Sequence, residues 1–180
     1  MRITGGAWRS RTVAGPPRGA PLRPTPDALR EQAFGVLSPH LAGAVFLDLF
    51  AGTGAVSLEA LSRGAALAVL CEQARTAQEL IRRNFAGLGV PPEAWELHPG
   101  PVARSLPRLA ARGLRATLAW CDPPFADWEA GLDALALAAS TSVLAAGALV
   151  VLELPPKRTV ALAGFETARP LRGAVLLRKE

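Results

Sequence analysis

Apolar and polar positions along the chain predict strands and helices in regular alternation. From residue 44 onward, short apolar runs predict strands, and the stretches between them carry apolar residues at helical spacing. Strands are expected over residues 45–50, 66–71, 95–98, 116–121 and 148–153. One helix is expected to contain Leu58 and Leu61 and to end at Gly64, and others are expected over residues 74–88, 102–112 and 128–139. This order predicts an α/β fold in which helices cover both faces of a mostly parallel sheet.

The two ends of the chain depart from this alternation. Residues 1–24 are rich in Gly and Pro, which predicts an extended or turned arm or a short hairpin. Thr25, Pro26 and Asp27 then predict the start of a helix that has Thr25 as its N-cap and ends near Pro39. After residue 153, two further strands are expected, over residues 160–163 and 174–178.

The charge of the chain is concentrated at its N-terminus. The 180 residues carry a formal net charge of +5. In residues 1–26 the ionised side chains are five arginines: Arg2, Arg9, Arg11, Arg18 and Arg23. The 15 basic and 15 acidic side chains of the remaining residues cancel. A basic arm on a neutral body is typical of a protein that binds a polyanion, and charge alone leaves a solvated tail as the alternative.

Length and composition exclude several classes of protein. At 180 residues, half of them apolar, the chain is expected to form one ordinary domain with a sizeable core. The cysteines, Cys71 and Cys121, are too few for a disulfide framework or a metal cluster. The first ten residues are polar, and no apolar run reaches the ~18–20 residues of a membrane span. We therefore expect a soluble, cytoplasmic protein without a signal peptide, a metal ion or a membrane partner.

The first candidate site follows the strand that is expected to end at residue 50. In Asp48-Leu49-Phe50-Ala51-Gly52-Thr53-Gly54, the glycines allow a tight turn that approaches a ligand at the N-terminus of a helix. A dinucleotide-binding motif would need a glycine where Ser57 stands, and the carboxylate of Asp48 would repel a pyrophosphate. Asp48 instead suits a ligand with an ammonium group, such as the methionine end of S-adenosylmethionine.

Two more carboxylates stand at expected strand ends. Glu72 follows Gly52 by 20 residues and ends the next strand, where a carboxylate can accept both hydroxyls of a ribose. Because ligands of open α/β sheets bind outside the carboxyl ends of the strands, Asp48, Glu72 and Asp122 are expected to line one crevice. Taken singly, each of them is better explained as a strand-end cap, whereas the three together in one crevice favour a binding site.

The second candidate site is Asp122-Pro123-Pro124-Phe125, after the strand that ends at Cys121. Two prolines fix the backbone, so that the side-chain and backbone carbonyls are presented rigidly. Such acceptors can hold the two hydrogens of a planar exocyclic amine, while Phe125 offers a face for base stacking. The alternative interpretation of these residues is a turn that merely ends the strand.

In this order, these motifs resemble the class I S-adenosylmethionine-dependent methyltransferases that act on amino nitrogens. Over almost the whole chain, further segments are similar to the bacterial small-subunit 16S rRNA guanine-N2 methyltransferases. These segments are Arg2-Ile3-Thr4-Gly5-Gly6, Trp8-Arg9, Leu22-Arg23-Pro24-Thr25-Pro26-Asp27, Gln32-Ala33-Phe34, Ser57-Leu58-Glu59-Ala60-Leu61-Ser62-Arg63-Gly64 and Leu152-Glu153. The resemblance implies a Rossmann-like methyltransferase sheet, S-adenosylmethionine as cofactor and methylation of one guanine of 16S rRNA.

The resemblance also implies a role for each candidate residue. Residues 1–25 would form a basic arm that contacts RNA, and residues 26–180 the methyltransferase domain of a monomer that acts on an assembling small subunit and not on DNA. The expected catalytic residues are Asp122, Pro123, Pro124 and Phe125. The expected cofactor-binding residues are Asp48, Phe50, Ala51, Gly52, Thr53, Gly54, Glu72 and Val102. The expected RNA-binding residues are Arg2, Arg9, Arg11, Arg23 and Thr25.

One position departs from the family pattern. Pro101 stands where the family usually carries an Asp or Asn that binds the adenine of the cofactor, so the backbone N–H of Val102 is the expected partner of adenine N1. Related Asp-Pro-Pro motifs also occur in N6-adenine and protein-glutamine methyltransferases, which remain alternatives. A further alternative is a non-catalytic RNA-binding factor that retains the fold.

Overall fold

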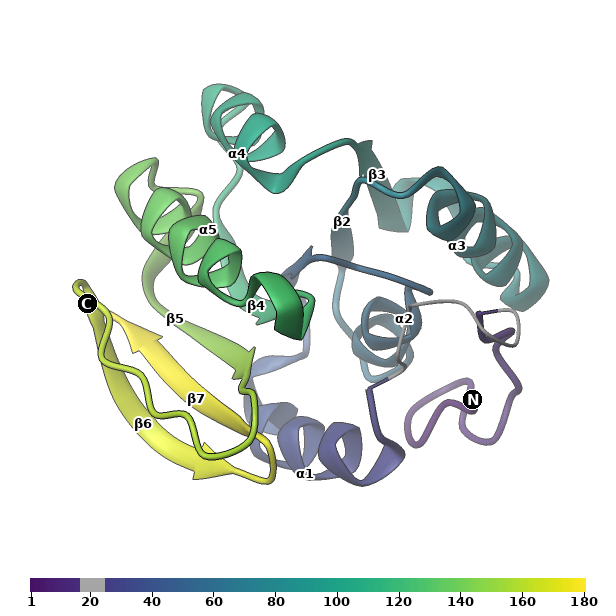
Figure 1. Cartoon of the computed structure of the whole chain (residues 1–180). Coiled ribbons are helices and arrows are strands. Elements are labelled where there is room, and N and C mark those ends of the chain that lie inside the picture. The colour runs from purple at the N-terminus through teal and green to yellow at the C-terminus, as the bar shows by residue number, and fades with distance from the viewer. Residues whose placement is uncertain (17–24) are drawn as a thin grey trace.

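The structure is a computed structural model, and it describes residues 1–16 and 25–180 (Figure 1). The strands are β1 (Val45–Leu49), β2 (Leu67–Glu72), β3 (Trp95–Pro99), β4 (Ala116–Cys121), β5 (Leu144–Glu153), β6 (Phe165–Leu171) and β7 (Ala174–Lys179). The helices are α1 (Asp27–Leu37), α2 (Ala55–Ser62), α3 (Arg75–Leu88), α4 (Val102–Ala111) and α5 (Glu129–Ser140). In these described ranges, no helix has the length and apolar character needed to cross a membrane.

The strands form one sheet in the order β3-β2-β1-β4-β5-β7-β6. The pairs from β3 to β5 are all parallel, whereas β7 runs antiparallel to both β5 and β6. The prediction of a mostly parallel sheet is therefore confirmed. The chain proceeds from β1 outward to β3 and then crosses back to β4, so the direction of winding reverses between β1 and β4. Open α/β sheets bind their ligands at this kind of position.

Alternate side chains of the central strands point to opposite faces of the sheet, and both faces are buried. On one face, Phe46 and Trp120 pack with residues of α1 and α2. On the other face, Leu47 and Cys121 pack with residues of α4 and α5. Burial on both faces explains why these strands are continuous apolar runs in the sequence.

Two predictions of local structure are wrong. Residues 160–163 form no strand, because Val160 and Leu162 pack as partly buried side chains against the core. The strand is instead β6, whose residues are mostly exposed and gave no apolar run. Thr25 is not the N-cap of α1, because Pro26 occupies that position and no side chain caps the helix. The hydroxyl of Thr25 donates to Glu153 instead.

The described part of the N-terminal arm, residues 1–16, packs against α2 and α3. Ile3 and Val13 are buried in a cluster with apolar residues of these helices. Asn84 of α3 accepts a hydrogen bond from the backbone N–H of Ala14 at 3.0 Å and donates to its carbonyl at 3.1 Å. Deleting this segment would expose the core, so its role in binding must be tested by substitution of surface residues.

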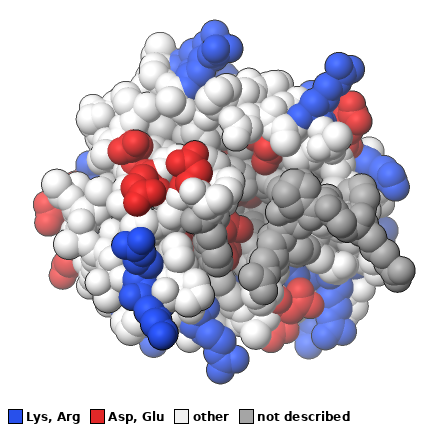
Figure 2. All heavy atoms as spheres, viewed as in Figure 1, with Lys and Arg blue, Asp and Glu red and all other residues white. Residues whose placement is uncertain are grey.

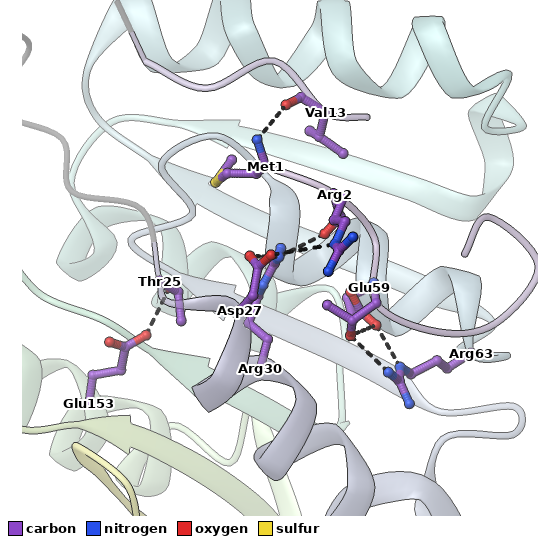
Figure 3. A network of polar contacts seen from close by, with 10 residues as sticks. Met1, Arg2, Val13, Thr25, Asp27, Arg30, Glu59, Arg63 and Glu153 are labelled. Atoms are coloured by element: carbon purple, nitrogen blue, oxygen red, sulfur yellow. Dashed lines mark hydrogen bonds and ion pairs between the residues drawn. The ribbon is translucent and has the colours of Figure 1, made fainter. Parts of the chain in front are cut away.

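Buried charged residues also anchor the arm (Figure 3). Glu59 of α2 accepts hydrogen bonds from the backbone N–H and the hydroxyl of Thr4, at 2.8 and 2.7 Å. Arg63 forms an ion pair with the same carboxylate at 2.7 Å. Arg30 of α1, which is fully buried, donates to the carbonyl of Arg2 at 2.7 Å. The backbone of the arm is thus held at both α1 and α2.

Candidate active site

A cavity of about 1460 Å³ lies at the carboxyl ends of the parallel strands. Four acidic residues on different strands line it, and we call them the acidic floor: Asp48 of β1, Glu72 of β2, Asp122 directly after β4, and Glu153 of β5. The structure therefore brings the three predicted carboxylates together at the reversal point of the sheet. It adds Glu153 as a fourth.

The turn between β1 and α2 has the left-handed backbone that its glycines predict. The φ angles of Phe50, Gly52 and Gly54 are 70°, 55° and 75°. A Cβ on Gly54 would lie 2.8 Å from Cε2 of Phe85, so this position admits no side chain. Asn84 donates to the carbonyl of Thr53 at 2.9 Å, which fixes the turn to α3.

Asp48 is a buried carboxyl group without a cationic partner. Ser57 donates to its Oδ2 at 2.6 Å, and no Lys or Arg of residues 1–16 and 25–180 forms an ion pair with it. Burial raises the pKa of Asp48 to about 7; the hydrogen bond from Ser57 opposes this rise and the charge of Glu72 adds to it. A ligand ammonium group in the cavity would supply the missing positive charge.

The carboxylate of Glu72 is held by two backbone groups. Its Oε2 accepts from the N–H of Gly52 at 2.8 Å, and its Oε1 accepts from the N–H of Ala74 at 2.7 Å. A carboxylate has about four lone-pair sites, so acceptor capacity remains for two hydroxyl groups of a ligand. The glycine turn and the start of α3 thus orient the side chain that the sequence assigned to a ribose.

Asp122 and Glu153 are bridged by the hydroxyl of Thr25 and form what we call the acid pair. Oε1 of Glu153 accepts from Nε1 of Trp120 at 3.1 Å. It also accepts from the hydroxyl of Thr25 at 2.9 Å (Figure 3). The same hydroxyl lies 3.4 Å from Oδ2 of Asp122. Burial, followed by the charge of Glu153, raises the pKa of Asp122 to about 8, and burial raises the pKa of Glu153. At neutral pH the pair therefore holds a proton.

The two prolines after Asp122 are held in place by α5. Pro123 is buried, and a Cβ on Gly131 would lie 2.5 Å from its Cγ, so the helix can approach only because residue 131 is a glycine. Pro124 is exposed and, like Pro123, lines the cavity. The side chain of Phe125 lies outside the described part of the structure, so its predicted stacking role stays a prediction.

All but one of the other predicted cofactor residues lie around the same cavity; the exception is Gly54, which is absent from its described lining. Phe50, Ala51, Gly52, Thr53 and Val102 line it. Val102 is the first residue of α4, and the first N–H groups of a helix have no partner within the helix, so its N–H is available to an acceptor such as adenine N1.

The predicted RNA-binding residues divide into two groups. Thr25 lies in the cavity wall and contacts the acid pair. Arg2, Arg9 and Arg11 have exposed side chains and are absent from the described residues that line the cavity. Arg23 lies outside the described residues.

The sequence analysis missed residues that complete the site. Glu153 ends an apolar strand as Asp48 and Glu72 do, so the argument used for them would have found it. Trp120 is buried in β4, and its role as a donor to Glu153 follows only from the pairing of β4 with β5. Gly131 had no signal in the sequence, because its closeness to Pro123 is a tertiary contact.

The cysteines that flank β1 are free and buried. Cys71 and Cys121 are both in register with Leu49, one on each neighbouring strand. Burial raises the pKa of the Cys71 thiol to about 12, so this group stays protonated at neutral pH. In residues 1–16 and 25–180, no group of three His, Cys, Asp or Glu side chains could hold a metal ion.

The sheet order, the glycine turn and the acid-lined cavity together define a Rossmann-like methyltransferase fold, and solved structures share it. A hypothetical protein of Thermus thermophilus is 33% identical with a TM-score of 0.81, over 100% of this chain and 99% of that one. The Escherichia coli protein yhhF is 30% identical with a TM-score of 0.82, over 100% of this chain and 98% of that one.

The chain belongs to the family described as conserved hypothetical protein 95, whose sequence model matches residues 1–171. A relative in Escherichia coli K12, named ribosomal RNA small subunit methyltransferase D, is 39% identical over 127 residues. That match covers 69% of this chain and 60% of the relative. The family resemblance that the motifs predicted is thereby confirmed.

Proposed function

We propose that this protein transfers a methyl group from S-adenosylmethionine to the exocyclic N2 of one guanine in 16S rRNA, within an assembling small ribosomal subunit. The observation that carries the proposal is the rigid Asp122-Pro123-Pro124 turn, which lies in the same cavity as Asp48 and Glu72. The name of the Escherichia coli relative supports rRNA of the small subunit as the substrate.

The residues of the cavity fit S-adenosylmethionine. Asp48 is buried and lacks a cation, which suits the ammonium group of the methionine end. Glu72 keeps acceptor capacity for the ribose, as its two hydrogen bonds come from backbone N–H groups. The N–H of Val102 would serve adenine N1, in place of the side-chain contact that Pro101 cannot make. When bound, the cofactor supplies an electrophilic methyl group on a positively charged sulfur.

Asp122 would hold and deprotonate the target amine. The lone pair of guanine N2 is delocalised into the ring, so orientation and removal of water must supply much of the rate. We assign one N–H of the amine to the carboxylate of Asp122 and the other to the backbone carbonyl of Pro123. As N2 forms its bond to the methyl carbon, the bond between that carbon and the sulfur breaks and its electron pair stays on the sulfur. The nitrogen then carries one proton too many, and the acid pair, with one of its two carboxyl groups ionised, takes that proton. No covalent intermediate on the protein is needed.

Incubation with labelled S-adenosylmethionine and small subunits that lack the modification tests this proposal. We expect the label in 16S rRNA, and we expect Asp122→Ala to abolish its incorporation. Label in ribosomal proteins would indicate the glutamine methyltransferase alternative. Binding of subunits without any transfer by the wild-type protein would favour the non-catalytic alternative.

A further inference from the structure

The C-terminal part of the chain is basic, although the net charge of the body as a whole does not show it. Residues 26–153 hold nine basic and 13 acidic side chains, a net charge of −4. Residues 154–180 hold six basic and two acidic side chains, a net charge of +4. The body of the protein is thus neutral only in sum, because a basic C-terminal segment offsets an acidic one.

Three of these basic residues line the central cavity: Lys157 and Arg158, between β5 and β6, and Arg172, in the turn between β6 and β7. We call them the C-terminal rim. All three are exposed, and none forms an ion pair with another residue that the structure describes. They are the Lys and Arg residues among the described lining of the cavity that holds Asp122.

The backbone holds the rim in a defined position. The N–H of Leu154 donates to the carbonyl of Gly173 at 2.9 Å, which ties the two rim segments together. The N–H of Arg172 donates to the side chain of Gln32 in α1 at 2.8 Å. Lys157 has a φ of 63°, a conformation that non-glycine residues seldom adopt and that often marks functional segments.

Arg158 also connects the rim to the motif that holds the target base. Its guanidinium carbon lies 5.7 Å from the ring centre of Trp128, a residue that closely follows the Asp122–Phe125 motif in the chain. A cation over an aromatic face at this distance is attracted to it, so the guanidinium is pre-positioned beside the cavity.

The wall of the cavity on the side of α5 is acidic. Asp127 and Asp133 line it on the side of α5. Figure 2 shows acidic side chains gathered over α5 and basic side chains over the C-terminal strands, on two sides of the hollowed centre. A polyanion that enters the cavity is therefore drawn to the C-terminal side and repelled from α5.

We propose that Lys157, Arg158 and Arg172 bind the phosphates of the single-stranded RNA that flanks the target guanine. This inference rests on the proposed function and deepens it, because it adds a contact surface outside the N-terminal arm. The rim lines the same cavity as Asp122, so phosphates next to a base that enters this cavity come within its reach. Each phosphate that the rim neutralises releases counterions and so makes binding depend on salt.

The test compares two triple variants of equal charge. The rim variant is Lys157→Gln/Arg158→Gln/Arg172→Gln. The control variant is Arg104→Gln/Arg108→Gln/Arg115→Gln, which removes three exposed arginines on or just after α4 that do not line the cavity. The affinity of each for a 16S rRNA transcript is measured at several salt concentrations, together with KM for unmethylated small subunits and the affinity for S-adenosylmethionine.

We expect the rim variant to flatten the slope of log K against log salt by up to about 2, at −0.7 per phosphate contact, and to raise KM. Its affinity for S-adenosylmethionine should not change, and the control should keep the wild-type slope. An unchanged slope in the rim variant, or equal losses in both variants, would overturn the inference. If the wild-type protein transfers no methyl group, the proposed function fails, while the salt dependence of RNA binding still decides this inference.

Discussion

The acidic floor and the C-terminal rim of the central cavity differ in burial, in charge and in how their side chains are held. Asp48, Glu72 and Glu153 of the floor are buried, and each accepts hydrogen bonds from fixed partners. The rim side chains are exposed, and none of them forms an ion pair with another described residue. Buried, fixed groups suit the reaction and the cofactor, whereas exposed cations suit a long polyanion. We therefore expect floor variants to change turnover or cofactor binding, and rim variants to change RNA affinity.

The largest expected effect comes from Asp122. Asp122→Ala should lower kcat at least about 100-fold, because the target amine loses its acceptor and the departing proton its base. Affinity for S-adenosylmethionine, measured by calorimetry, should stay within roughly tenfold of the wild type. Asp122→Asn keeps a carbonyl acceptor and is expected to lose less. If Asp122→Ala instead loses the cofactor while Glu72→Ala binds it normally, the assignment of roles within the floor is wrong.

Asp48→Asn should weaken S-adenosylmethionine binding by about 10–100-fold, because a hydrogen bond between charged groups is lost. The same substitution should stabilise the ligand-free protein at alkaline pH. The pKa of Asp48 is raised to about 7 in the fold, so its contribution to stability is complete below its ordinary pKa of 3.8 and is lost as the pH rises through about 7.

Chemical unfolding at pH 5 and pH 8 checks the prediction for Asp48. From pH 5 to pH 8, the free energy of unfolding of the wild-type protein should fall by more than that of Asp48→Asn. Glu72→Gln removes a charge that adds to the raised pKa of Asp48, so it should lessen this fall, but by less than Asp48→Asn does. Parallel curves for all three proteins would contradict the burial of a titrating Asp48.

Glu153→Gln should move the pH dependence of kcat/KM to lower pH. The negative charge of Glu153 raises the pKa of Asp122, so its removal lets Asp122 ionise in less alkaline solution. Glutamine can still accept from Trp120, which preserves the packing. The control is Glu59→Gln, a change to a buried carboxylate that holds the arm and lies outside the cavity lining. A pH profile that shifts equally in both variants would rule out a specific coupling of Glu153 to Asp122.

The smallest expected effect distinguishes the rim from the N-terminal arm. Arg2, Arg9 and Arg11 do not line the cavity, so a triple change of these residues to Gln should weaken binding of full-length 16S rRNA. It should hardly affect a guanine-containing oligonucleotide of a few residues. The rim variant should weaken both. The comparison fails if the arm variant loses affinity for the short oligonucleotide as strongly as the rim variant does.

Local signals predicted much of the fold. The apolar runs predicted β1, β2, β4 and β5 because these strands are largely buried, whereas β3 is a partly buried edge strand with a weaker signal. The glycine turn was evident from Gly52 and Gly54. β6 was missed because an exposed edge strand needs no apolar residues. The capping prediction for Thr25 failed because its hydroxyl bonds to Glu153, 128 residues away in the sequence.

In the candidate site, too, local signals were visible in the sequence and tertiary contacts were not. Asp48, Glu72 and Asp122 were predicted, because a carboxylate at a strand end is visible in the sequence. The support of Asp122 by Glu153, Trp120 and Thr25 was not, because it depends on strand pairing. The rim was hidden for a further reason. The rim belongs to residues 154–180, whose net charge of +4 cancels against the acidic residues before them, so a count over the whole body gives zero.

Identification of the methylated nucleoside tests the central claim most directly. Unmethylated small subunits are incubated with the protein and S-adenosylmethionine, the 16S rRNA is digested to nucleosides, and the product is identified by mass spectrometry against standards. We predict N2-methylguanosine at one position, with none formed by Asp122→Ala. Formation of N6-methyladenosine, or of no methylated nucleoside, would contradict the assignment of the cavity to a guanine amine.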